Sequence, residues 1–138
     1  MAKIKVLIDT DIFIDYFNHG YFEEILENEE FTIYYSVITK KELLAKQGLK
    51  NSEKQAILYV LGKHRIINIS ADIANRYSAL LDEYPEISRE DALIAATALH
   101  KSLPLLTRNW KHYRKIKGLV LVGSKSKSAP ISFSSGKG

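Results

Sequence analysis

The sequence lacks cysteine altogether, and it lacks long hydrophobic runs. Without cysteine, disulfide bridges, zinc ribbons and thiol catalysis are excluded, which agrees with a reducing compartment. The longest mostly apolar segment, Ala92 to Leu99, is far too short to cross a bilayer. The N-terminal apolar stretch reaches Asp9 too early for a secretory signal peptide. We therefore expect a cytoplasmic protein with no membrane segment.

The sequence also has little excess charge once its basic residues are located. The net charge is +4, but residues 123–138 hold three of the 20 Lys and Arg residues and no acid. The remainder has 17 basic residues against 16 acidic ones, a net charge of +1, so bulk basicity is weak evidence for a nucleic-acid partner. We expect one domain over residues 1–122 and a disordered tail, rich in Ser, Lys and Gly, over residues 123–138.

Strand-like and helix-like segments alternate along the domain. The expected strands are Ile4–Ile8, Phe31–Ser36, Arg65–Ile69, Leu103–Thr107 and Leu119–Val122. The expected helices follow residue 9, lie within Tyr21–Glu30, and cover Val37–Lys46, Asn51–Gly62, Ser70–Glu83, Ser88–Lys101 and Asn109–Lys115. This alternation predicts an α/β fold with a parallel sheet of about five strands, covered by helices on both faces. No G-x-G-x-x-G follows the first strand, which excludes a dinucleotide-binding domain.

Carboxylates occur where strands end or helices begin. Asp9 and Asp11 follow the first strand, Glu42 and Asp91 lie early in helices, and the turn Thr107-Arg-Asn109 follows the fourth strand. In parallel α/β sheets the carboxyl ends of the strands share one edge, where ligands bind. A cluster of carboxylates without histidine or cysteine ligands selects hard cations such as Mg²⁺ or Mn²⁺.

Helix capping is the other explanation for these acids. Thr39-Lys-Lys-Glu42 and Ser88-Arg-Glu-Asp91 both match the capping-box pattern, and Asp9 stands where it can cap the first helix. A cap and a metal ligand are compatible roles for one side chain. Both explanations stay open at this point.

Four motifs in order make the chain resemble a known family. They are Leu-Ile-Asp9-Thr-Asp-Ile-Phe-Ile-Asp15, Ser36-Val-Ile-Thr39-Lys-Lys-Glu42, Asp91-Ala-Leu-Ile-Ala-Ala-Thr and Leu-Leu-Thr107-Arg-Asn109, with Arg114-Lys-Ile-Lys-Gly118-Leu as the closing segment. Together they resemble the PIN domain, and most closely the VapC-type toxins of toxin–antitoxin modules. The resemblance implies a three-layer α/β/α fold and a metal-dependent ribonuclease with Asp9, Glu42 and Asp91 as its acids. It also implies a homodimer that a small antitoxin protein neutralises.

We assign Asp9 and Asp91 as principal ligands of Mg²⁺ or Mn²⁺. Glu42 ligates the metal or orients the attacking water, and Thr107 and Asn109 complete the site. Many PIN nucleases have an aspartate where this chain has Asn109, so the site carries about three formal charges. Fewer charged ligands predict one tightly held ion, with a second arriving only with the RNA phosphate.

Two further residues bear on that missing charge. His112 stands where relatives with asparagine often have another acid. Asp11 supplies the charge if its side chain turns toward Asp9. The other histidines show no ligand spacing, and we interpret all four as structural or surface residues.

The segment Arg108–Lys117 concentrates five basic residues and no acid beside the expected site. The candidates for contact with RNA phosphates are Arg108, Lys111, Arg114 and, next to Glu42, Lys41. Trp110 and Tyr113 in the same segment are expected to pack inward.

Two alternatives remain. A catalytically weak PIN-like module that binds RNA or protein is favoured by Asn109. A haloacid-dehalogenase-like phosphatase would explain Asp9-Thr-Asp11, but Phe13 departs from that family's pattern and the chain is short for it.

Overall fold

A computed structural model of the chain describes residues 2–123 and the backbone of residues 132–135. A single six-stranded sheet has the order β3-β2-β1-β4-β5-β6. The strands are β1 (Ile4–Ile8), β2 (Phe31–Ser36), β3 (Arg65–Ile67), β4 (Leu105–Leu106), β5 (Val120–Gly123) and β6 (Ser132–Ser135). The first five pair in parallel, as predicted, and β6 adds an antiparallel strand beside β5 that the sequence did not predict.

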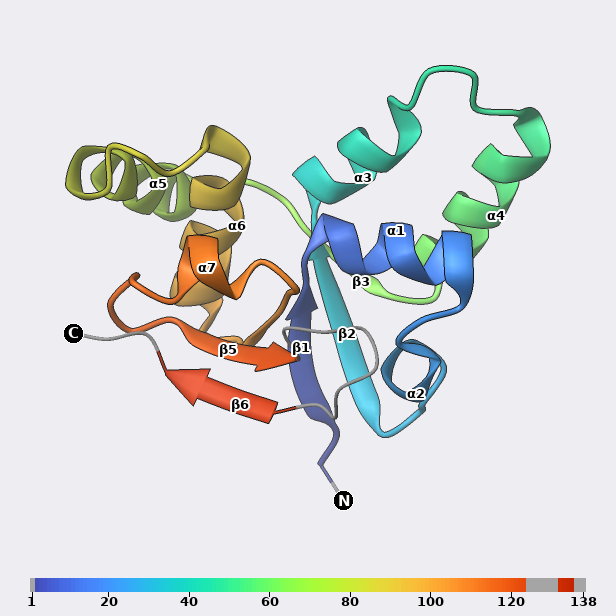
Figure 1. The fold of residues 1–138 in the computed structure, drawn as a ribbon, viewed down its shortest axis with the longest axis horizontal. Helices are drawn as coiled ribbons and strands as arrows, with labels where there is room; N and C mark the ends of the chain where they lie inside the picture. Colours follow the sequence, from blue (N-terminus) through green and yellow to red (C-terminus); the bar gives the residue numbers. More distant parts are fainter. Residues whose placement is uncertain (1, 124–131, 136–138) are drawn as a thin grey trace.

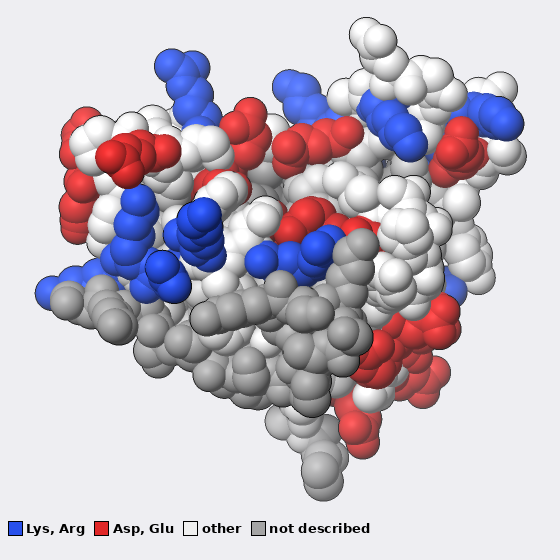
Figure 2. Space-filling view, in the orientation of Figure 1, with Lys and Arg blue, Asp and Glu red and all other residues white. Residues whose placement is uncertain are grey.

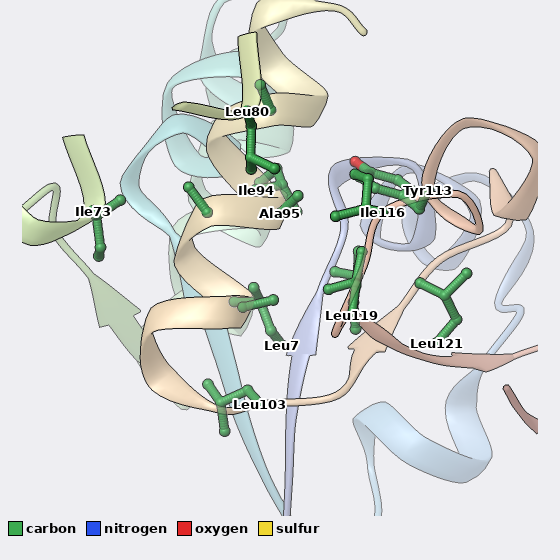
Figure 3. Close-up of a cluster of buried hydrophobic side chains, with 14 of the residues drawn as sticks. Leu7, Ile73, Leu80, Ile94, Ala95, Leu103, Tyr113, Ile116, Leu119 and Leu121 are labelled. Atoms are coloured by element: carbon green, nitrogen blue, oxygen red, sulfur yellow. The ribbon is translucent and has the colours of Figure 1, made fainter. Parts of the chain in front are cut away.

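Helices cover both faces of the sheet, which confirms the predicted α/β/α layers (Figure 1). They are α1 (Thr10–His19), α2 (Glu23–Leu26), α3 (Val37–Leu44), α4 (Asn51–Gly62), α5 (Ala71–Glu83), α6 (Arg89–Lys101) and α7 (Trp110–Tyr113). Val6 and Ile8 of β1 pack with side chains of α1 to α4, whereas Leu7 packs with those of α5 to α7 (Figure 3). Successive side chains of a strand point to opposite faces, so one buried strand supports both cores.

Several elements are shorter than the sequence predicted. Helix α3 ends at Leu44 and α2 covers only four residues, because Phe22 takes a left-handed conformation before it. Strand β4 has two residues, since Pro104 has no N–H to donate and Leu103 N–H bonds back to Ala98 at 3.0 Å. Strand β3 ends at Ile67.

The C-terminal tail differs in part from expectation. Gly123 closes β5, and Ser132–Ser135 form β6. Residues 124–131 and 136–138 lie outside the described residues, so the boundary at residue 122 and the disordered tail stay predictions. In the described part of the chain, no helix is both long and apolar enough to cross a membrane.

Candidate active site

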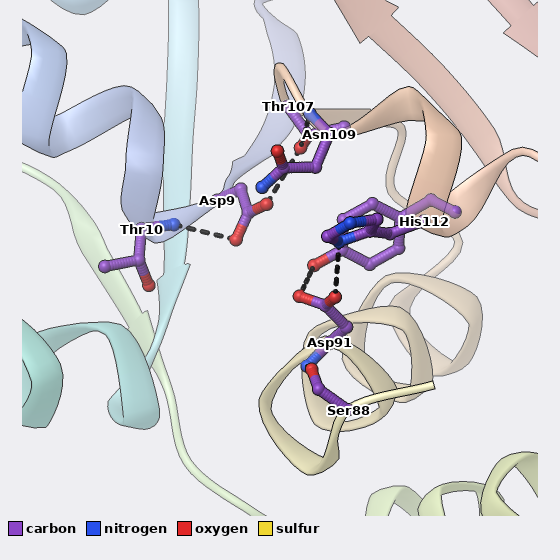
Figure 4. A network of polar contacts seen from close by, with 8 residues as sticks. Asp9, Thr10, Ser88, Asp91, Thr107, Asn109 and His112 are labelled. Carbon is purple, nitrogen blue, oxygen red and sulfur yellow. Dashed lines mark hydrogen bonds and ion pairs between the residues drawn. The ribbon is translucent and has the colours of Figure 1, made fainter. Parts of the chain in front are cut away.

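The strand ends place Asp9 at the centre of the site. Asp9 follows β1 directly, caps α1 by accepting from Thr10 N–H at 2.8 Å, and accepts from the Thr107 hydroxyl at 2.8 Å (Figure 4). Thr107, which follows β4, also accepts from Asn109 N–H at 3.0 Å. Asp9 is only 5% exposed. The expected cap is confirmed, and the same carboxylate is bonded to the turn after β4.

Two neighbouring carboxylates share this buried environment. Burial and the charge of Asp11 raise the pKa of Asp9 to about 7, although hydrogen bonds from Thr107 and Thr10 oppose this shift. Burial likewise raises the pKa of Asp11 to about 6, against the backbone hydrogen bond and charge of Arg108. One oxygen of Asp11, Oδ1, is buried without a hydrogen-bond partner among the described residues. Asp11 therefore lies close enough to Asp9 for the two carboxylates to affect each other, and its role as the missing charge of a metal site stays a prediction.

Asp91 enters the site from α6. Ser88 caps this helix by accepting from Asp91 N–H at 3.1 Å, so the predicted cap is made through the backbone of Asp91. Its carboxylate accepts from the Tyr113 hydroxyl at 2.9 Å and lies 3.0 Å from His112 Nδ1 (Figure 4). The cap thus uses the backbone N–H of Asp91 and not its carboxylate.

The alternative that Thr39 and Glu42 form a capping box is wrong. Ser36 caps α3, because β2 ends there, and Thr39 already lies inside the helix. Glu42 Oε1 instead accepts from the Thr10 hydroxyl at 2.9 Å, and the Thr10 and Thr39 hydroxyls are 2.9 Å apart. Partial burial raises the pKa of Glu42, and the charges of Glu90 and Asp91 raise it further. The hydrogen bond from Thr10 opposes this shift.

A pocket of about 200 Å³ joins these groups. Its lining residues are Asp9, Thr10, Asp11, Ile14, Glu42, Glu90, Asp91, Ile94 and Asn109. Figure 2 shows acidic side chains near the middle of this face with Lys and Arg side chains beside them. Asp9, Glu42 and Asp91, the acids assigned from the sequence, all line this one pocket. Thr107 does not line it but donates a hydrogen bond to Asp9.

The basic candidates divide into two groups. Arg108 pairs with the carboxylate of Asp15, which is only 7% exposed, and thereby ties the turn after β4 to α1. Lys111, Arg114 and Lys41 are exposed. The structure thus commits Arg108 to an internal ion pair and leaves the other three directed to solvent.

The donor set fits a hard divalent cation. The pocket offers carboxylate oxygens and the Asn109 amide, the buried Oδ1 of Asp11 has no partner among the described residues, and Asp9 is repelled by Asp11 and Asp91. Among the described residues, no three Asp, Glu or His side chains are close enough together to hold one metal ion. The pocket nevertheless offers oxygen ligands of the type that hard cations prefer.

Sequence reasoning missed three contacts of the site. Tyr113 was expected to pack inward, and it does, being fully buried, but its bond to Asp91 was not predicted. His112 was interpreted as a structural or surface residue, although it contacts the same carboxylate. The pairing of Asp15 with Arg108 spans 93 positions and has no local signal.

A family model and a curated relative match most of the chain. The PIN domain family model matches residues 6–118. Ribonuclease VapC1 of Methanocaldococcus jannaschii is 30% identical over 118 residues, covering 82% of each chain.

Solved structures with a similar fold match most of the chain as well. A toxin–antitoxin complex from Klebsiella pneumoniae contains a chain 37% identical, with a TM-score of 0.68, covering 83% of this chain and 94% of that one. VapBC2 from Rickettsia felis, bound to a DNA fragment from its promoter, contains a chain 25% identical, with a TM-score of 0.72, covering 88% and 99%. The chain belongs to the PIN domain family and, within it, to the VapC-type proteins.

Proposed function

We propose that this chain is a metal-dependent endoribonuclease that acts as the toxin of a toxin–antitoxin pair. The observation that carries the proposal is the gathering of Asp9, Asp11, Glu42 and Asp91 around one pocket at the strand ends of a PIN domain. Two relatives agree, since one is named a ribonuclease and another comes from a toxin–antitoxin complex. Membership in this family excludes the haloacid-dehalogenase-like alternative.

Asp9 and Asp91 would hold Mg²⁺ or Mn²⁺, with oxygen atoms of Asp11, Glu42 and Asn109 as further ligands. A bound divalent cation would offset the mutual repulsion of the acids and stabilise the negative charge that develops on the phosphate during cleavage.

Glu42 is the residue best placed to orient the attacking water and accept its proton. Its carboxylate lies on α3, at an exposed position of the pocket, and Thr10 fixes one of its oxygens. A raised pKa makes an ionised carboxylate a stronger proton acceptor. Lys41, Lys111 and Arg114 supply exposed positive charge for the RNA phosphates.

An apolar groove beside the pocket is the surface that we propose for antitoxin binding. It has a volume of about 460 Å³ and is lined by side chains of α1, α3 and α4, among them Ile14, Phe17, Leu43 and Ile57. Ile14 and Glu42 line both the groove and the acidic pocket. A segment bound in this groove would therefore reach the site and block it, which gives the antitoxin a direct route to inhibition.

The homodimer is supported by the edge of the sheet. Strand β3 is an outer strand, and no described strand pairs with its free side. Ile66 and Ile69 at this edge are each 39% exposed. Exposed apolar residues on an unpaired edge favour association between copies. Sedimentation equilibrium should give the mass of two chains for the wild type and of one for Ile66→Lys.

Expression without the neighbouring antitoxin tests the proposed function. The wild-type chain should arrest growth, and RNA from the arrested cells should carry new 5′ ends. Asp9→Ala should relieve the arrest. Equal toxicity of the two proteins, or arrest without RNA cleavage, would point to the alternative of a binding module without catalysis.

A further inference from the structure

Two side chains of α7 hold both oxygens of Asp91. The Tyr113 hydroxyl donates to Oδ1 at 2.9 Å, and His112 Nδ1 lies 3.0 Å from Oδ2 (Figure 4). An ionised carboxylate only accepts hydrogen bonds, so Nδ1 must carry the proton. Asp91 belongs to α6, and the two donors therefore reach it from a different element.

The Tyr113 hydroxyl has a fixed position and a fixed role as donor. Its ring is fully buried and packs in the core with Ile116 and Leu119 (Figure 3). Burial and the charges of Asp9 and Asp91 raise the pKa of Tyr113 well above its usual range. The hydroxyl is the donor of this pair, because a carboxylate oxygen accepts.

The Asp91 carboxylate needs such a partner, because the negative charge of Asp9 repels it. The negative charges of Asp9 and Asp91 repel each other, and an aspartate side chain at the start of a helix can rotate toward solvent. Its side chain is only 19% exposed here, and one of its oxygens accepts from the hydroxyl of Tyr113, whose ring is fully buried. Carboxylate ligands of metals are commonly held by outer partners of this kind.

We propose that Tyr113, assisted by His112, is a positioning residue that orients the Asp91 carboxylate toward Asp9 and Asp11 across the pocket. This inference rests on the proposed metal site. Tyr113 touches neither metal nor RNA in this account and acts only through Asp91.

The test measures Mn²⁺ binding by the paramagnetic resonance signal of free Mn²⁺, in the absence of RNA. Tyr113→Phe keeps the ring and removes the hydroxyl, and it should weaken Mn²⁺ binding by about tenfold. His112→Ala, at an exposed side chain, should weaken binding by a smaller factor. Both variants should unfold near the wild-type temperature.

Tyr16→Phe is a matched control. The Tyr16 hydroxyl donates to a carboxylate oxygen of Glu27 at 2.7 Å, and neither residue lines the acidic pocket. This variant loses the same kind of hydrogen bond and should bind Mn²⁺ like the wild type.

The outcomes separate the two proposals. Unchanged or tighter Mn²⁺ binding by Tyr113→Phe would overturn the positioning role, and if that variant fails to fold, unchanged binding by His112→Ala would do so. Wild-type protein that binds no Mn²⁺ would overturn both proposals. Mn²⁺ binding that depends on Tyr113, without RNA cleavage, would count against the ribonuclease assignment alone.

Discussion

Replacing Asp9 by asparagine should stabilise the metal-free protein at pH 8. The folded state raises the pKa of Asp9 from 3.8 to about 7, chiefly through burial and the charge of Asp11. A carboxyl group with a raised pKa binds its proton more tightly in the folded state than in the unfolded state. Its contribution to stability is therefore complete below about pH 4 and is lost as the pH rises through 7. Asparagine carries no charge and escapes this loss.

The pKa shift sets the size of the effect. A rise in the pKa from 3.8 to about 7 corresponds to a cost of about 4 kcal/mol for the ionised form at high pH. Asparagine keeps an oxygen for Thr10 N–H, and its amide can donate to the Thr107 hydroxyl oxygen, but these bonds are weaker than those to a carboxylate. We expect a net gain of about 2 kcal/mol, or about 5–10 °C in Tm.

Thermal unfolding with chelator present, from pH 4 to pH 8, measures this difference. The stability of Asp9→Asn relative to the wild type should rise with pH and level off above pH 7. Added Mn²⁺ should narrow the gap, because it stabilises only the protein that binds it. An advantage that is absent at pH 8, or that grows toward low pH, would refute the electrostatic reasoning.

Three further variants test the site. Asp91→Asn should abolish cleavage and leave Tm nearly unchanged, because the Ser88 cap uses the backbone N–H of Asp91; a large drop in Tm with activity retained would make capping its main role. Asn109→Asp adds a carboxylate to the pocket and should lower the Mn²⁺ concentration for half-maximal cleavage, while calorimetry of the RNA-free wild type should show one strong metal site rather than two. Lys111→Ala should weaken RNA binding for all sequences alike and reduce the slope of log K against log salt by about one, as counterion release predicts; an unchanged slope would place this lysine outside the RNA path.

The fold was predictable because the order of strand-like and helix-like segments in the sequence is the order that a layered α/β/α fold requires. The buried part of β1, Val6 to Ile8, is an unbroken apolar run, and a helix with apolar residues at helical spacing follows it. The acids were found for a related reason, since residues that end strands or begin helices meet at one edge of a parallel sheet. Asp9 shows that a cap and a site carboxylate can be one residue.

The contacts that shape the acids were not predictable from local pattern. Tyr113 and Asp91 are 22 positions apart and meet only because α7 folds over the start of α6. The capping box at Thr39 was misplaced because Ser36, three residues earlier, also suits a cap, and only the end of β2 decides between them. Strand β6 lies in a segment whose Ser-rich composition favours disorder over a strand.

Cleavage of a structured RNA by the purified protein, with and without divalent metal, tests the central claim most directly. The wild-type chain should cut internal phosphodiester bonds with Mg²⁺ or Mn²⁺, stop when EDTA is added, and recover when metal is restored, while Asp9→Asn stays inactive and folded. Cleavage that persists after thorough metal removal, or that Asp9→Asn retains in full, would contradict the account.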